Sequence, residues 1–231
     1  MKNFTLDGRL SSAAKFVRQG ARFADIGTDH AYLPIFLLCS GRIEYAFASD
    51  INEGPLASAI ENARDMGVYS KMEFALADGL DAIRDKGITD IAICGMGGEL
   101  IASIVERADF IRIPEIRLIL QPMSKFSHLR RALAKIGYEI EDEEYSESQG
   151  KNYITLSVRF TGEIREIDEF EAEFGSKRLL ASLSESQREF ISKRAAALDR
   201  AAEGLKKGGH DGTLEAELSA YAKEILGRKD I

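Results

Sequence analysis

The segment ADIGTDHAYLP, residues 24–34, decides the fold that we expect for this chain of 231 residues. A short apolar run ends there in Asp25, Gly27 and Asp29, a pattern typical of a buried strand that stops at a tight turn. The glycine lets the backbone turn closely against a ligand. Because two carboxylates beside that turn would repel an anion, the segment predicts a site for a positively charged ligand.

Four more short apolar runs follow, and each ends at an acid, a glycine or a proline. They are EYAFASDI, MEFALADG, DIAICGMGG and IRLILQPM. Helix-like patterns cover residues 55–66, 100–107 and 128–136 between these runs. Continuous apolar runs are typical of parallel strands buried on both faces, and their alternation with helices predicts a doubly wound α/β sheet of five parallel strands.

The pattern changes after the fifth predicted strand. Residues 138–145 and 152–160 are strand-like, and the segment between them is too short for a crossover helix, so we expect an antiparallel hairpin at the sheet edge. The result is the mostly parallel, seven-stranded, Rossmann-like sheet of class I SAM-dependent methyltransferases. Helical patterns at residues 179–205 and 214–226 predict a coiled-coil-like helical hairpin C-terminal to the sheet. We expect a methyltransferase domain at residues 1–162 and a helical domain at residues 163–231.

Acids and glycines follow the first four predicted strands, at the edge of an open α/β sheet where ligands bind. Asp50 follows Gly27 by about 20 residues, the spacing at which an acid commonly binds ribose hydroxyls. Asp78, after the third strand, is placed to accept a hydrogen bond from an adenine amine. Any one of these acids could instead be a helix N-cap. Their presence at successive strand ends, without the three glycines of a pyrophosphate loop, favours a cationic nucleoside, S-adenosylmethionine (SAM).

Several motifs together resemble one protein family. In order they are LDGRLSSAAKFV, ADIGTDHAYLP, SDINEGPLASA, ADGLDAI, ICGMGGELIA and RLILQPMSKFSHLRRAL. The set resembles the bacterial TrmK family of tRNA (adenine-N1)-methyltransferases, which modify the adenine at position 22 in the D-arm of tRNA. The resemblance covers most of residues 5–160, with Met123 standing where relatives often show asparagine. It implies SAM as the cofactor and tRNA as the partner.

The resemblance and the strand-end pattern together give the expected site. The expected cofactor residues are Asp25, Gly27, Thr28, Asp29, His30, Asp50, Ile51, Asn52, Asp78, Gly79, Gly95, Met96 and Gly97. By resemblance, residues 95–98 with Gln121 and Pro122 border the target base.

The chemistry places little demand on a general base. Adenine N1 has an in-plane lone pair, so it can attack a sulfonium methyl without losing a proton, and positioning supplies most of the catalysis. A residue that holds the N6 amine and stabilises the developing ring charge would help most. We expect Asp29 in this role, followed by His30 and Tyr32. The alternatives are that His30 only orients the loop and that Tyr32 packs in the core.

Binding of tRNA requires a local basic surface, because the net charge of the chain is −7. Residues 177–207 carry eight basic residues against four acidic ones, so we expect the helical domain to be the RNA arm. A solvated charged face is the alternative. The expected phosphate contacts are Arg130, Arg131, Lys177, Arg178, Lys193 and Arg194. Two other functions stay open: a methyltransferase acting on a small molecule, and a SAM-binding protein that associates with RNA without catalysis.

Other features of the sequence limit its chemistry. Cys39 and Cys94 lie in apolar runs, so we expect buried thiols and no disulfide. The three histidines are scattered without partners at metal-ligand spacing, so we expect no metal. The longest apolar run, residues 32–39, is far shorter than the about 20 residues that cross a bilayer, and the N-terminus has no signal-peptide pattern. We expect a soluble, cytoplasmic protein with no membrane partner.

Overall fold

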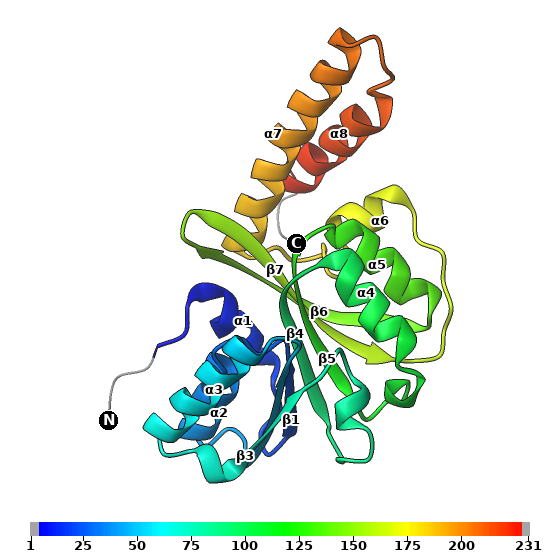
Figure 1. The fold of residues 1–231 in the computed structure, drawn as a ribbon. Coiled ribbons are helices and arrows are strands. Elements are labelled where there is room, and N and C mark those ends of the chain that lie inside the picture. The colour runs from blue at the N-terminus through cyan, green and yellow to red at the C-terminus, as the bar shows by residue number, and fades with distance from the viewer. Residues whose placement is uncertain (1–4, 228–231) are drawn as a thin grey trace.

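A seven-stranded sheet forms the centre of the molecule, which is known from a computed structural model that describes residues 5–227 (Figure 1). Its strand order is β3-β2-β1-β4-β5-β7-β6. The strands are β1 (Arg22–Ile26), β2 (Tyr45–Asp50), β3 (Met72–Leu76), β4 (Asp90–Gly97), β5 (Arg117–Ser124), β6 (Tyr138–Ser148) and β7 (Lys151–Phe160). β1 to β5 run parallel, and β7 and β6 add the antiparallel edge, so the predicted sheet is confirmed.

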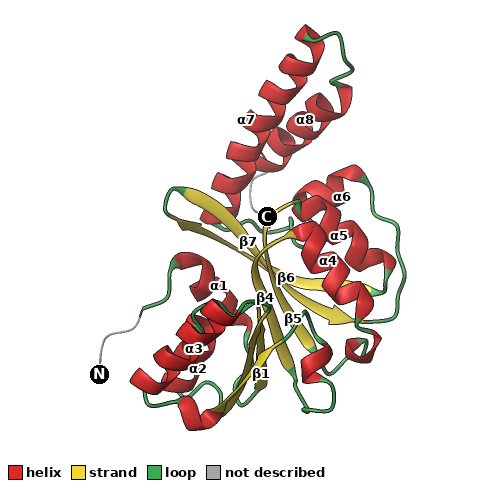
Figure 2. Ribbon diagram, viewed as in Figure 1, coloured by secondary structure: helices red, strands yellow, loops and turns green. Residues whose placement is uncertain are grey.

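Helices cover both faces of this sheet (Figure 2). They are α1 (Gly8–Phe16), α2 (Tyr32–Cys39), α3 (Glu53–Asp65), α4 (Gly98–Arg107), α5 (Phe126–Lys135), α6 (Glu169–Phe174), α7 (Glu185–Lys207) and α8 (Thr213–Gly227), with short 3-10 turns η1 (Tyr69–Lys71), η2 (Asp81–Ile83) and η3 (Asp109–Ile111). α1, α2 and α3 pack on one face of the sheet in one hydrophobic core, and α4 and α5 pack on the other face in a second core. None of the helices within residues 5–227 has the length and apolar composition to cross a membrane.

The strand order determines where a ligand can bind. β1 pairs with β2 on one side and with β4 on the other, so the order of the strands reverses between β1 and β4. The core residues Phe23 of β1 and Phe47 of β2 are buried, as expected for strands covered on both faces. The carboxyl ends of these strands therefore form the crevice in which open α/β sheets bind their ligands.

The edge hairpin is longer than the sequence pattern predicts. β6 continues to Ser148 and β7 begins at Lys151, so only Gln149 and Gly150 form the turn. Both have positive φ angles, 52° and 73°, as the two central residues of a type I′ turn require. This short turn extends the strands beyond the predicted limits of 145 and 152.

The C-terminal helices form an arm that projects from the sheet domain (Figure 1). α7 and α8 pack against each other around Ile191, Leu198 and Leu218. α7 begins six residues later than predicted, because Ser184 and Gln187 form a capping box that fixes its first turn. The short helix α6 was not predicted. β7 ends at Phe160, and we keep the division of the chain into two domains at residue 162 as a proposal. Residues 1–4 of the first proposed domain and 228–231 of the second lie outside the described residues.

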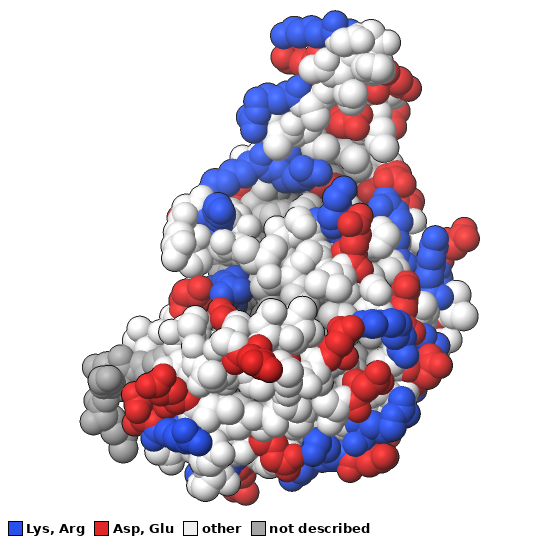
Figure 3. All heavy atoms as spheres, viewed as in Figure 1, with Lys and Arg blue, Asp and Glu red and all other residues white. Residues whose placement is uncertain are grey.

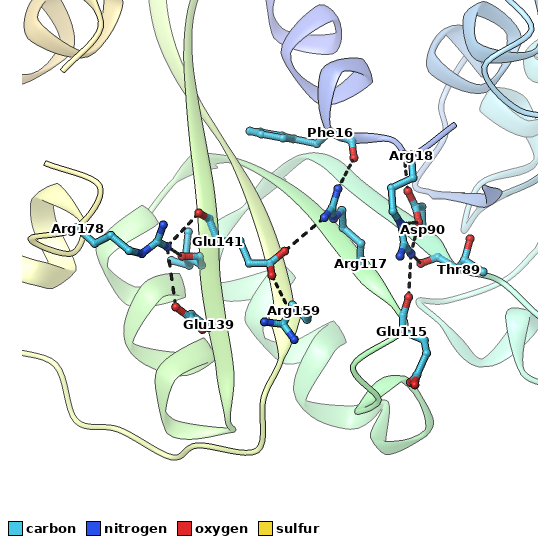
Figure 4. Close-up of polar contacts among 11 residues, drawn as sticks. Phe16, Arg18, Thr89, Asp90, Glu115, Arg117, Glu139, Glu141, Arg159 and Arg178 are labelled. Carbon is cyan, nitrogen blue, oxygen red and sulfur yellow. Dashed lines mark hydrogen bonds and ion pairs between the residues drawn. The ribbon is translucent and has the colours of Figure 1, made fainter. Parts of the chain in front are cut away.

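An arginine after α1 ties this helix to the sheet (Figure 4). Arg18 donates from Nε to the buried carboxylate of Asp90 at 2.7 Å, and from Nη2 to the carbonyl oxygens of Thr89 and Glu115 at 2.7 and 2.8 Å. Arg117 of β5 also donates to the carbonyl oxygen of Phe16, at 3.3 Å. These contacts fix α1 over the sheet, and its opposite end reaches the crevice.

Candidate active site

A cavity of about 360 Å³ lies at the carboxyl ends of β1 to β4. Its lining residues are Arg9, Leu10, Asp25, Ile26, Gly27, Thr28, Asp29, His30, Tyr32, Leu33, Asp50, Ile51, Asn52, Ala77, Asp78, Gly79, Cys94, Gly95, Met96, Leu100 and Ile104. They include every expected cofactor residue except Gly97, and also Tyr32. The structure thus brings together expected residues that are up to 71 positions apart in the sequence, from Asp25 to Met96.

The first loop requires its glycine for two reasons. Gly27 has a φ of +72°, and a Cβ there would lie 2.1 Å from the Cε atom of Met96. The backbone N–H groups of Gly27 and Thr28 both donate to the carbonyl oxygen of Ser49, at 2.8 and 2.9 Å. The turn after β1 is therefore held against the end of β2, with the side chain of Met96 above it.

Asp25 is a buried carboxyl group at the base of the cavity. Only 5% of the residue is exposed, and burial raises its pKa to about 6, although the hydrogen bond from Thr28 and the charge of Arg9 act in the opposite direction. Thr28 Oγ1 donates to Asp25 Oδ2 at 2.7 Å. A group with this pKa ionises readily when a cationic ligand lies beside it.

Asp50 joins the loops that follow β1 and β2. Its Oδ1 accepts a hydrogen bond from the backbone N–H of Asn52 at 2.9 Å, and its Oδ2 accepts one from the backbone N–H of Asp29 at 3.3 Å. The residue is 8% exposed. Oδ1 also accepts a hydrogen bond from the side-chain amide of Asn52 at 3.4 Å, whereas Oδ2 accepts only one from the described residues, so Oδ2 keeps the capacity to accept a hydrogen bond from a ligand hydroxyl.

Three of the expected catalytic residues lie together at the rim. Asp29 Oδ1 is 3.6 Å from His30 Nε2, and the side chain of Asp29 is 68% exposed. The His30 ring stacks on Tyr32 with ring centroids 5.2 Å apart and an angle of 24° between the planes. Tyr32 is 40% exposed, so the alternative that it packs in the core is wrong. The group can reach a substrate that enters from solvent.

Arg9 is a cavity residue to which the sequence interpretation gave no role. It lies on α1, and its Nη1 donates to Gln121 Oε1 at 3.3 Å. Among the described residues that line the cavity, Arg9 is the one arginine or lysine, whereas Asp25, Asp29, Asp50 and Asp78 are acidic. The motif LDGRL contained it, but nothing in that motif shows that α1 packs over the ends of β4 and β5.

Gln121 and Pro122 are buried and do not line the cavity, so the structure does not support their predicted contact with the target base. Gln121 accepts a hydrogen bond from the backbone N–H of Gly95 at 3.1 Å and donates from Nε2 to the Pro122 carbonyl oxygen at 3.1 Å. Its amide holds Arg9 and the Gly95 turn in place. Gly97 is likewise not among the residues that line the cavity.

Comparisons with known proteins agree with this geometry. Residues 6–156 match the model of a methyltransferase domain. The chain belongs to this methyltransferase family. A tRNA (adenine(22)-N(1))-methyltransferase of Bacillus subtilis is 38% identical over 156 residues, which are 68% of this chain and 66% of that protein. The chain thus aligns with slightly less than two thirds of this curated relative.

Solved structures match a larger part of this methyltransferase. A Streptococcus pneumoniae protein in complex with S-adenosyl-L-methionine is 34% identical, with a TM-score of 0.81, over 94% of this chain and 98% of that one. The B. subtilis M1A22 tRNA methyltransferase TrmK has a TM-score of 0.81 at 28% identity, over 97% and 98% of the two chains. The resemblance to the TrmK family is therefore confirmed.

One expected RNA contact of the methyltransferase is wrong. The Arg130 side chain is 1% exposed and donates from Nε and Nη2 to Glu143, whose side chain is 0% exposed, at 3.0 and 2.8 Å. Burial lowers the pKa of the guanidinium, but the Glu143 carboxylate outweighs this and raises it above its usual range. A guanidinium enclosed in this way cannot reach a phosphate.

The other expected RNA contacts differ in how far they are engaged within the chain. Arg131 pairs with Glu169, Arg194 pairs with Glu173, and Arg178 donates to the carbonyl oxygens of Ile140 and Glu141. Lys193 pairs with Glu189 and donates to Asn152, and Lys177 is exposed. All five keep at least part of their surface in solvent, so their contact with RNA stays a prediction.

Buried thiols and the absence of a metal site are two further expectations from the sequence. Cys39 is exposed at the end of α2, so the prediction that it is buried is wrong. Cys94 is partly buried in the cavity wall, where burial raises the pKa of its thiol above the usual range. Within residues 5–227, His, Cys, Asp and Glu side chains form no group of three that could hold a metal ion.

Proposed function

We propose that this methyltransferase uses SAM to methylate N1 of adenine 22 in the D-arm of tRNA, giving 1-methyladenosine. The observation that carries the proposal is the cavity, in which acids from three successive strand ends face a single arginine. The similarity to TrmK over nearly the whole chain supports the same activity. A tRNA substrate also supports the proposal that the enzyme acts in the cytoplasm.

The cavity fits SAM in its charges and its shape. Asp50 is suited to a ribose hydroxyl, because its Oδ2 accepts a single hydrogen bond within the described part of the chain and keeps acceptor capacity. Asp25 and Asp29 supply negative charge for the sulfonium and ammonium groups. Ile51, which is 65% exposed at the cavity edge, offers an apolar surface to a flat base. Asp78 lies 3.5 Å from Arg107 and is the proposed acceptor for the adenine amine.

The transfer needs positioning more than proton removal. When bound, SAM supplies an electrophilic methyl group on a positively charged sulfur. The lone pair of adenine N1 forms the new bond to carbon as the bond from carbon to sulfur breaks, so the positive charge moves to the adenine ring. Asp29 at the rim is suited to hold the N6 amine and to stabilise this charge, and the His30 ring lies beside it.

The arm is the proposed surface for the tRNA. Lys193, Arg200 and Lys207 are exposed on α7 at intervals of seven residues, so they share one face of the helix. α8 instead carries three glutamates and one lysine, and Figure 3 shows basic side chains gathered along the α7 side of the arm. Basic residues in this arrangement favour binding of the phosphate backbone along α7.

Labelled SAM and purified tRNA test the proposal directly. The chain should transfer label to tRNA, and mapping should place the methyl at N1 of adenine 22. A tRNA with guanine at position 22 is the matched control and should accept no label. Label in a small molecule instead, or SAM binding without transfer to any acceptor, would overturn the proposal in favour of the corresponding alternative.

A further inference from the structure

The junction between the sheet domain and the arm contains a buried polar core. Arg130 of α5 makes its two hydrogen bonds to Glu143 of β6, and its Nη1 donates to the carbonyl oxygens of Ala172 and Glu173 at 3.0 and 3.1 Å. Tyr145 donates from its hydroxyl to Glu143 at 2.6 Å. A single guanidinium thus joins α5, β6 and the end of α6, directly before the chain enters the arm.

A second layer attaches α7 to the same core. Arg194 pairs with Glu173, and the Phe126 ring contacts both guanidiniums, with ring centroid distances of 5.6 Å to Arg130 and 5.7 Å to Arg194. Phe190 of α7 packs on Phe126 edge to face, at 5.8 Å between ring centroids. The base of α7 is therefore fixed by charge and by aromatic packing at once.

The junction is also continuous with the cavity wall. Phe126 begins α5, and the preceding Lys125 has a φ of 56°. The backbone of Ser124 and Lys125 packs so closely on Gly98 that a Cβ there would lie 2.4 Å from the Lys125 carbonyl oxygen. Gly98 directly follows the Gly95 to Gly97 turn. A packed path therefore runs from the cavity wall through Lys125 and Phe126 to α7.

We infer that Arg130, Glu143 and Arg194 are positioning residues, which fix the direction of the arm and so select the nucleotide that reaches the cavity. The inference rests on the proposed function. A helix of the length of α7 extends about 34 Å, so a rotation of about 10° at its base would move its far end by about 6 Å. That displacement exceeds the about 3.4 Å rise between successive nucleotides of a duplex strand.

The test removes the outer ion pair of the junction without leaving a buried charge. The double variant Glu173→Gln with Arg194→Met keeps both side chains close to their original size and removes the charge contact between α7 and the core. The matched control is Asp199→Asn with Lys223→Met, which removes an ion pair within the arm, between α7 and α8. Both are compared with the unchanged chain on tRNA substrates whose target adenine stands at position 21, 22 or 23.

We expect the junction variant to bind SAM within threefold of the unchanged chain, and to lose affinity for tRNA by a smaller factor than it loses rate. Its single-turnover rate at saturating tRNA should fall at least tenfold for adenine 22, and its preference for 22 over 21 and 23 should fall at least fivefold. The control should keep both values. Arg194→Lys, which retains a cation for Glu173, should restore most of the preference. If the double variant does not fold, Phe190→Leu loosens the same contact with less change in charge and should show the same loss of preference.

Three results would overturn the inference. An unchanged rate and preference in the junction variant would show that the arm direction does not select the nucleotide. A loss of tRNA affinity that matches the loss of rate, with the preference retained, would show that the junction only stabilises the arm. No label in tRNA with the unchanged chain would overturn the proposed function, and this inference with it.

Discussion

The cavity and the junction each bury an ionisable group, but the two groups differ in the number of their hydrogen-bond partners. Asp25 in the cavity has a threonine hydroxyl as its close partner, and burial raises its pKa to about 6. Arg130 in the junction has two hydrogen bonds to Glu143 and two to backbone carbonyl oxygens. In this molecule the incompletely paired buried carboxyl group lies in the candidate binding cavity, whereas the fully enclosed ion pair connects two structural units.

Removing half of the junction pair should have the largest effect of the substitutions considered. Glu143→Ala leaves the Arg130 guanidinium buried without its carboxylate, so the free energy of unfolding should fall by about 3–5 kcal/mol in urea denaturation. Lys15→Ala is the control, because it removes an exposed ion pair with Glu144 and should cost about 1 kcal/mol or less. Equal losses for the two variants would erase the contrast between a buried and an exposed pair.

A substitution in the cavity should lower the affinity for the ligand instead of the free energy of unfolding. Asp50→Ala removes the carboxylate that is proposed to bind the ribose, so the affinity for SAM should fall by about 1–3 kcal/mol. Isothermal titration calorimetry measures this, with Glu53→Ala as a nearby control on the first turn of α3. Unchanged SAM affinity in the Asp50 variant would move the ribose to another part of the cavity.

Asp25 makes the cavity sensitive to pH. Because its folded-state pKa of about 6 lies above the ordinary value of 3.8, the folded chain binds this proton more tightly, and the free energy of unfolding without ligand should fall as pH rises from 3.8 to about 6. A cationic ligand favours the ionised form, so the affinity for SAM should weaken about tenfold between pH 7 and pH 5. Calorimetry at both pH values tests this, and Asp25→Asn should remove most of the difference. A pH dependence that survives in Asp25→Asn would assign it to another group.

The same contrast explains what could be predicted from the sequence. The strands and the cavity acids follow from local patterns, since a buried parallel strand is a continuous apolar run and its last residues lie at a known edge of the sheet. Arg9 was missed because its contact with Gln121 joins residues 112 positions apart. Arg130 was misassigned for the same reason, since its basic neighbour Arg131 is surface-exposed in part and the sequence does not show which of the two faces Glu143.

The end of α2 and the start of α7 also differ from the prediction. Cys39 was expected in the core because α2 is apolar along most of its length, but the last residue of a helix lies beyond the packed part of its face. The start of α7 was placed too early, since residues 179–184 have helix-forming leucine and alanine and the capping box at Ser184 decides the boundary. Both errors concern the ends of elements, where the capping side chains and the packing of a single turn, and not the helical period, set the outcome.

The smallest expected effect on the cofactor concerns Asp29, which belongs to the cavity but faces solvent. Its side chain is 68% exposed and lies beside His30 at the rim, whereas Asp25 and Asp50 lie deeper. This position favours contact with the target base over contact with the cofactor. Asp29→Asn should therefore lower the single-turnover rate about tenfold, a loss of transition-state stabilisation of about 1.4 kcal/mol, while SAM affinity stays within about threefold. Rates at saturating SAM are measured beside a direct SAM titration. If Asp29 instead serves the cofactor, affinity will fall first and the rate at saturating SAM will recover fully, and the rim would then belong to the cofactor site.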